Sequence, residues 1–291
     1  MATHDTVAWL NKLDAVLRPG LFVLVIFLIL LELAVLSFKK IKVSHKGGGV
    51  SLLSGAFVFG LEAVADFLFY LSVTYWLYAH RIFDLGFKWY VWVLCFLLYD
   101  LMFYISHLLQ HKVRLLWCFH SVHHTAEEMR LSTAVRGSVF DFIYAPPFFV
   151  WMCVLGIHPL VFIVVRTISR VWGVLEHISE PLAGHMPLLN KIFITPDVHR
   201  VHHGKNTQYI DKNYAEVLSI WDRLFGTYVE YEEKPVYGIL KPVDANSFFD
   251  IQFAGFKSLI ADLRDTKGRK NRIMVIFMPP GWRPGWRKAV D

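Results

Sequence analysis

The sequence predicts an all-α integral membrane protein, a bundle of about four to five spanning helices with a helical cap on the cytoplasmic side. Of its 291 residues, 55% are apolar and 16% are aromatic, whereas roughly 45–50% apolar is usual for soluble domains. The apolar residues also form long runs, and residues 21–38 contain a single charged residue. About 17–25 apolar residues cross the hydrocarbon core of a bilayer, so composition and clustering together indicate a membrane protein.

Five apolar stretches account for the predicted spans. They are residues 21–38, 52–78, 89–106, 140–156 and 159–175. The last two are short for a crossing of roughly 30 Å, and a re-entrant hairpin that turns at the GIHP sequence of 156–159 is the alternative. The histidine motifs described below lie within residues 21–230, which we expect to form one membrane-embedded domain.

The two ends of the chain have a different character from the spans. Val7, Leu10, Leu13 and Leu17 recur at helical spacing, so residues 1–20 are expected to form an interfacial helix on the membrane surface. A frayed polar tail is the alternative there. Residues 231–291 are more polar, and we expect a cytosolic tail.

Basic residues flank the spans and indicate their orientation. The formal net charge is +6, and basic clusters lie at 38–46, 111–114 and 267–272. An excess of Lys and Arg in short loops marks the cytoplasmic side, which places 107–139 and everything from about 177 onward there, in a bacterial inner membrane or the endoplasmic reticulum. The basic groove with interleaved aromatics that nucleic acid requires is missing, so the lipid bilayer is the expected partner.

The sequence contains histidines at metal-ligand spacing. The motifs are HLLQH at 107–111, HSVHH at 120–124 and HRVHH at 199–203. Spacings of three and four residues place imidazoles on one face of a helix. His177 ends the fifth apolar run, and His158 is expected at the far turn, away from the others. The candidate ligands are His107, His111, His120, His123, His124, His177, His185, His199, His202 and His203.

The number of histidines exceeds what one ion needs. A transition metal takes four to six ligands, so the set predicts two metal ions. Imidazole suits Fe, Zn, Cu and Ni, and spacing does not choose among them. Two other classes are a zinc-dependent membrane hydrolase and a metal transporter. A catalytic zinc site typically uses three protein ligands, and a transporter places its ligands near the bilayer midplane, so both fit less well.

Carboxylates near the motifs are candidates for contacts behind the ligands. Asp100 lies two helical turns before His107, where an ionisable residue in an apolar stretch suggests a functional site; a helix–helix hydrogen bond is the alternative. Asp197 precedes the last motif and is a second candidate. For Asp222, an ion pair with Arg223 is expected.

Four charged residues lie inside the apolar runs at helical spacing. Glu62 and Asp66 belong to the second run, and Arg166 and Arg170 belong to the fifth. Unpaired charges at membrane depth are costly, so we expect these residues to pair across the bundle. Binding of a lipid headgroup by the arginines is the alternative.

These motifs, in this order, resemble the fatty acid hydroxylase/sterol desaturase superfamily of histidine-rich di-iron membrane oxygenases. The resemblance covers roughly residues 90–230. Within the superfamily, LSTAVRGSV (131–139), TPDVHRVHHGKN (195–206) and PVYGILKPV (235–243) are most similar to the alkylglycerol monooxygenase branch. One departure is Lys112, which follows His111 where that branch has an acidic residue.

The resemblance implies a reaction and its cofactors. Two iron ions, held by the histidines named above, would activate O2 to attack a C–H bond of a membrane lipid, with no catalytic residues implied beyond the ligands. In the alkylglycerol branch, attack beside an ether oxygen gives a hemiacetal that breaks down to an aldehyde and a glycerol derivative. A sterol, fatty-acyl or amino-lipid hydroxylase or desaturase is the alternative. The implied electron donor is tetrahydrobiopterin, or a protein partner of cytochrome b5 or ferredoxin type.

Overall fold

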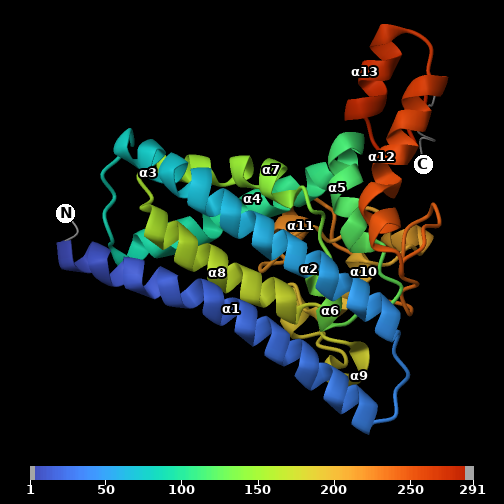
Figure 1. Ribbon diagram of the computed structural model, residues 1–291, viewed down its shortest axis with the longest axis horizontal. Coiled ribbons are helices and arrows are strands. Elements are labelled where there is room, and N and C mark those ends of the chain that lie inside the picture. Colours follow the sequence, from blue (N-terminus) through green and yellow to red (C-terminus); the bar gives the residue numbers. More distant parts are fainter. Residues whose placement is uncertain (1–3, 286–291) are drawn as a thin grey trace.

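Long helices run side by side through the computed structural model, which describes residues 4–285 (Figure 1). Their bounds are α1 His4–Phe38, α2 His45–Ala65, α4 Trp89–Lys112 and α8 Pro159–Leu175. Three stretches are long and apolar enough to cross a membrane, namely Pro19–Phe38, His45–Ala79 and Trp89–Lys112. Among residues 4–285 there are isolated β-bridges but no named strand, which confirms the all-α membrane fold.

The second spanning stretch consists of three consecutive elements. Helix α2 continues through a π-helical turn, η1 Asp66–Tyr70, into α3 Leu71–Ala79. The extra residue of a π-turn rotates the side chains that follow it relative to a regular α-helix. The stretch is therefore one continuous helical segment, and the side chains before and after the π-turn face different neighbours.

The expected span at 140–156 is wrong as a continuous helix. This segment forms three short pieces, α7 Asp141–Tyr144, η2 Pro146–Phe148 and η3 Val150–Cys153. Pro146 and Pro147 lack the amide N–H that an α-helix needs, and their rings clash with the preceding turn. Apolar composition alone predicted a crossing, but the two prolines prevent a single helix.

The expected separate helix at residues 1–20 is also different in the structure. Helix α1 runs from His4 to Phe38 with Pro19 inside it, so the first segment continues into the first spanning stretch. The side chains of Val7, Leu10 and Leu13 lie outside the described residues. Leu17 is partly buried.

The charged residues inside the long helices are paired, as expected. Both Glu62 oxygens accept hydrogen bonds from Arg170 at 2.8 Å. Arg166 lies 3.7 Å from Glu62 and 3.9 Å from Asp66. Pairing removes the cost of isolated charges next to lipid, and it joins α2 and η1 to α8.

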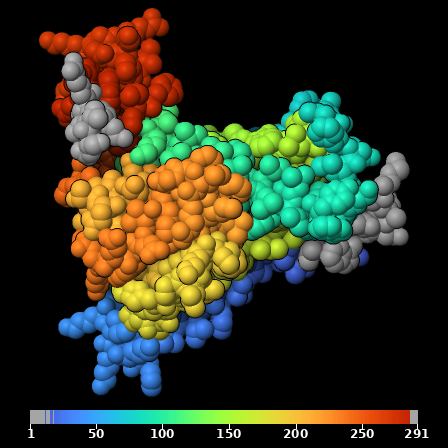
Figure 2. Space-filling view, turned by 180° about the vertical axis from the view of Figure 1, so that it is seen from behind, coloured from blue at the N-terminus to red at the C-terminus, as the bar shows by residue number. Residues whose placement is uncertain are grey.

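Shorter elements form a cap at one end of the long helices (Figures 1 and 2). They are α5 Arg114–His124, α6 Leu131–Ala134, α9 Glu180–Ala183, η4 Leu189–Lys191, α10 Pro196–His202, η5 Thr207–Tyr209 and α11 Ile220–Leu224. Buried Glu32 of α1 ties the cap to the bundle, because it accepts hydrogen bonds from the amides of Leu131 at 2.7 Å and Ser179 at 2.9 Å.

The other end of the bundle contains His158. Its ring packs against Tyr78 and Phe87, with centroid distances of 4.8 and 4.7 Å. It is therefore remote from the cap, as the predicted topology requires.

The last part of the chain is a helical hairpin of α12 Phe248–Asp265 and α13 Arg269–Phe277. Helix α12 packs on α5, and Ile251 and Leu259 are buried there. Gly255 permits this close approach, because a Cβ at this position would lie 2.9 Å from Cys118 Cα. The expected tail thus packs on the cap through α12.

Candidate metal centre

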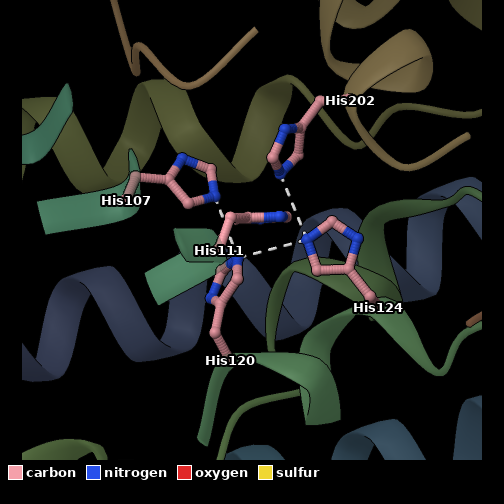
Figure 3. Close-up of side chains that lie close together, drawn as sticks. All are labelled: His107, His111, His120, His124 and His202. Atoms are coloured by element: carbon pink, nitrogen blue, oxygen red, sulfur yellow. Dashed lines mark hydrogen bonds between the residues drawn. The ribbon is translucent and has the colours of Figure 1, made fainter. Parts of the chain in front are cut away.

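Nine of the ten candidate histidines converge in the cap as two adjacent groups. The first group is His107 and His111 of α4, His120 and His124 of α5, and His202 of α10. The second group is His123 of α5, His177 after α8, His199 of α10 and His203 after α10. In each group, one ring nitrogen from every residue lies within 4.8 Å of those of the others. Figure 3 shows the five rings of the first group pointing toward a common centre.

Helical spacing produces this convergence. The motif on α5 divides between the groups, because His120 and His124 are one turn apart on one face and His123 lies beside them. Helix α10 and the residue after it divide in the same way, with His202 in the first group and His199 and His203 in the second. The two similar five-residue motifs therefore supply histidines to both groups rather than one group each.

Backbone carbonyls determine the orientation of four of these rings. A carbonyl only accepts, so the Nδ1 atom that contacts it must carry the proton and donate. The donor and acceptor residues, with their N···O distances, are His107 to Tyr214 (2.8 Å), His202 to Lys212 (2.9 Å), His123 to Arg136 (3.1 Å) and His177 to Gly173 (2.7 Å). A neutral imidazole has one N–H, so each of these rings turns an Nε2 lone pair into its group.

Burial keeps the rings neutral. It lowers the pKa of His123 and of His202 to about 4. It also lowers the pKa of His177, His199 and His203 well below the ordinary value, and neighbouring histidines add to the effect. At neutral pH these side chains are therefore neutral, and each has a lone pair on one of its two ring nitrogens.

In the second group this leaves two lone pairs facing each other. The Nε2 atoms of His123 and His177 are 3.2 Å apart, yet each ring has its only proton on Nδ1. No hydrogen bond can form between two acceptors, so this contact is repulsive unless a cation lies at it. A metal ion that takes neutral imidazole nitrogens satisfies both atoms.

A count of the protons in the first group also indicates a site for a cation. Its Nε2 atoms make three contacts, His107 to His120 at 2.9 Å, His120 to His124 at 3.1 Å and His124 to His202 at 3.1 Å. Only His120 and His124 are free to carry an inward proton, so three contacts have at most two donors. The buried Nε2 of His111 has no hydrogen-bond partner among the described residues. These atoms fit the donor set of a metal ion.

The loop of residues 210–218 supplies two of the orienting carbonyls and is itself held by two buried carboxylates. Asp222 accepts hydrogen bonds from the amides of Tyr214 at 2.7 Å and Ala215 at 2.8 Å. Asp100 accepts from the amides of Val217 at 2.9 Å and Leu218 at 3.0 Å. Asp100 therefore holds the loop whose carbonyls contact the histidines. The sequence had suggested a direct contact between Asp100 and a histidine.

Two other expectations for this region are altered. Asp222 holds the loop instead of pairing with Arg223, whose guanidinium lies 3.7 Å from the centroid of the Tyr228 ring. Asp197 accepts from the amide of Met186 at 2.6 Å and contacts His185 Nδ1 at 2.9 Å. These contacts fasten the loop before α10.

His185 lies outside both histidine groups. Its side chain is 55% exposed, and its ring packs edge-on against Tyr231 at 4.7 Å between centroids. The structure thus gives this residue a contact with Asp197 and does not bring it to the other nine.

Sequence reasoning missed two carboxylates that touch the groups. Glu176 Oε2 lies 3.4 Å from His199 Nδ1 and is buried; its position next to His177 was the available signal. Asp211 Oδ1 lies 3.8 Å from His111 Nδ1, and its other oxygen pairs with Lys112. An acidic group therefore does lie beside the first motif, but a distant segment supplies it.

A cavity of about 420 Å³ reaches the first group from the side of α12. Three histidines of that group and His203 of the second group line it, and residues 238–243, residues 279–281 and part of α12 contribute to the rest of its wall. Arg114, Lys205 and Lys241 bring positive charge to it. A mainly apolar cavity with a few charges suits an amphiphilic molecule.

The chain was compared with known proteins. Residues 92–227, which include both histidine groups, match the fatty acid hydroxylase family. The alkylglycerol monooxygenase of Homo sapiens is 38% identical over 194 residues, 67% of this chain and 43% of that protein. The alkylglycerol monooxygenase of Caenorhabditis elegans is 32% identical over 249 residues, 80% of this chain and 47% of that protein.

A more distant relative is the ornithine lipid hydroxylase of Rhizobium tropici, 30% identical over 178 residues, 61% of this chain and 50% of that protein. The chain thus spans about half the length of the relatives it matches. No solved structure matches it. Residues 92–227, which hold all nine clustered histidines, are thus a fatty acid hydroxylase domain.

Proposed function

We propose that this protein is a membrane-bound lipid monooxygenase that uses O2 and two iron ions to hydroxylate a C–H bond of a lipid. The observation that carries the proposal is the pair of histidine groups, whose inward nitrogens outnumber their protons. A hydroxylase family and relatives named monooxygenases favour iron among the metals that accept imidazole. When bound, two iron ions would supply the two-electron chemistry that O2 activation requires.

The chain's own residues have three tasks in this proposal. The carbonyls of Tyr214, Lys212, Arg136 and Gly173 hold Nδ1 protons, so that the Nε2 atoms are available as ligands. Burial keeps the ligands neutral and keeps water away from the reacting carbon. The cavity beside α12 would bind the part of the lipid that leads to the first group.

The substrate that we propose first is an ether-linked alkylglycerol. Relatives of that activity match at 32–38% identity, and hydroxylation beside an ether oxygen would release an aldehyde. Asp211 supports this version, because it places a carboxylate near His111 despite the lysine at position 112. Tetrahydrobiopterin would then be the reductant.

A second candidate is hydroxylation of another lipid, such as an amino lipid, a sterol or a fatty acyl chain. The match to an ornithine lipid hydroxylase favours it, as do the cations at the cavity. A cytochrome b5 or ferredoxin-type protein would then supply the electrons.

Metal analysis and product analysis test the proposal together. Purified active protein should contain about two irons per chain, and activity with zinc alone would contradict the oxygenase and favour a hydrolase. Alkylglycerol, reductant and ¹⁸O2 should yield an aldehyde and a glycerol product, with label entering at the carbon attacked. Label found only in an ornithine lipid, sterol or acyl substrate would select the second candidate.

A further inference from the structure

Helix α12 has an apolar face that the rest of the protein leaves uncovered. Phe249, Phe253 and Ile260 are spaced by four and seven residues, so they share one side of the helix. Their exposed fractions are 71%, 37% and 48%. Ile251 and Leu259 lie on another side and are buried against the cap. The uncovered face, defined by those three residues, therefore points away from the cap.

This face continues the lipid-exposed surface of the long helices. At the start of α12, Phe248 packs against Phe57 of α2 at 5.3 Å between ring centroids, and Phe57 is 47% exposed on a membrane-spanning stretch. The ring centroid of Phe253 lies 6.3 Å from that of Phe140, the residue before α7. An apolar surface thus passes from the span onto α12 through aromatic contacts.

Positive charge accompanies this apolar surface. Residues 257–272 include six basic and two acidic residues. Lys257 is 68% exposed beside the uncovered face, and α13 exposes Ile273 and Phe277, one turn apart, at 49% and 61%. Apolar residues on one face with basic residues beside them are typical of helices that lie in the interface of an anionic membrane.

The direction of the hairpin agrees with that location. In Figure 1, α12 and α13 stand side by side and project crosswise to α1, α2 and α4 at the cap end. If those long helices cross the bilayer, the hairpin lies along the membrane surface.

We propose that the α12–α13 hairpin rests on the anionic surface of the leaflet that adjoins the cap. The uncovered face of α12, together with Ile273 and Phe277, enters the boundary of the acyl chains, and the basic residues contact headgroup phosphates. Ala254 and Ser258 line the cavity that reaches the histidines, so α12 separates this cavity from the lipid. The proposal is independent of the reaction that the histidines catalyse.

Spin labels on the full chain in nanodiscs test the proposal. The three native cysteines are buried, so label introduced by Ile260→Cys or Phe277→Cys reports its own position. The matched control is Asp265→Cys, an exposed position on another side of α12. In nanodiscs with 30% phosphatidylglycerol, the labels at 260 and 277 should collide with lipid-dissolved oxygen several-fold more than with a water-soluble nickel chelate. The control should show the reverse.

Two results would overturn the proposal. One is equal accessibility of the labels at 260, 277 and 265 to the nickel chelate, which would mean that the hairpin is surrounded by water.

The other result concerns the basic residues of the hairpin. Replacing Lys267, Arg269, Lys270 and Arg272 with Gln should raise nickel accessibility at 277 to the value found in pure phosphatidylcholine, and an unchanged value would remove the anionic surface as the partner.

Discussion

In four of the clustered histidines the two ring nitrogens have separate roles. In His123 and His177 the outer nitrogen donates to a backbone carbonyl, and this contact alone leaves the inner nitrogen unprotonated. Such outer contacts orient a ligand and tune its basicity in metal proteins. The same residue type elsewhere in the chain has another role, as His158 shows among aromatic rings.

Replacing a clustered histidine should remove metal, whereas replacing His185 should not. We expect His202→Ala to lower metal content and to reduce turnover by more than about 100-fold, which exceeds the 10–100-fold typical of an outer contact. His185→Ala is the matched control and should keep both values near those of the native protein, because this side chain lies outside both groups. Elemental analysis and turnover on the same samples decide the point, and loss of metal from His185→Ala would refute the grouping.

The metal-free protein should lose stability in mild acid. Burial lowers the pKa of His123 and His202 to about 4, whereas in the unfolded chain it is about 6.5. Between these values the unfolded chain binds more protons, so the free energy of unfolding falls as pH falls. Thermal melts of chelator-treated protein should move to lower temperature from pH 6.5 to pH 4.5. A melting temperature that rises in acid would contradict this assignment.

At the scale of elements, the irregular loop at 210–218 helps to orient histidines that the helices carry. It places two carbonyls behind His107 and His202, and Asp100 and Asp222 help to keep it in that position. Hydrogen bonds to a buried carboxylate are worth about 1.5–3 kcal/mol each, enough to fix a loop without regular structure.

Asp222→Asn should therefore weaken the centre without touching a ligand. An amide has one acceptor oxygen where the carboxylate has two, so one of the two loop amides loses its partner. We expect metal retention against a chelator to fall by roughly 10–100-fold. Asp250→Asn on α12 is the control, because its partner Lys257 is exposed at 3.5 Å and such pairs contribute about 1 kcal/mol or less. Equal retention in both variants would show that the loop does not orient the histidines.

At the scale of the molecule, the bundle separates two ends with different properties. One end carries the loop of residues 80–88 and the His158 contacts, and the other carries the cap with both histidine groups. Figure 2 shows the cap segments as a continuous block at one end of the long helices. A membrane across the three spanning stretches would place these ends on opposite sides.

Cysteine labelling of sealed vesicles should reveal this arrangement. Asp84→Cys lies at the loop end and Lys234→Cys lies in the cap, and both positions are exposed. A membrane-impermeant maleimide should label each from one side only, and the two from opposite sides. By the distribution of basic residues, the cap side is expected to be cytoplasmic. Labelling of both positions from the same side would contradict the membrane placement.

Much of this protein could be predicted from the sequence because the signals are local. Apolar runs gave the helices of the bundle, and histidines three and four residues apart had to share a helical face. For the segment at 140–156 a re-entrant hairpin was the alternative to a spanning helix. The spanning helix was wrong because composition was weighed above Pro146 and Pro147, whose effect on a helix is equally local. The charge pairs between the second and fifth runs were also predicted, because isolated charges in lipid are costly.

The sequence by itself therefore determined the helical class, the membrane association and the histidines of the centre. Only the tertiary structure decided how those histidines divide into two groups, which carbonyls face them, and that Asp211 stands beside His111. These contacts join residues up to about a hundred positions apart, as between His107 and Tyr214. They depend on how helices and loops pack in three dimensions, and the periodicity of a single segment carries no information about that packing.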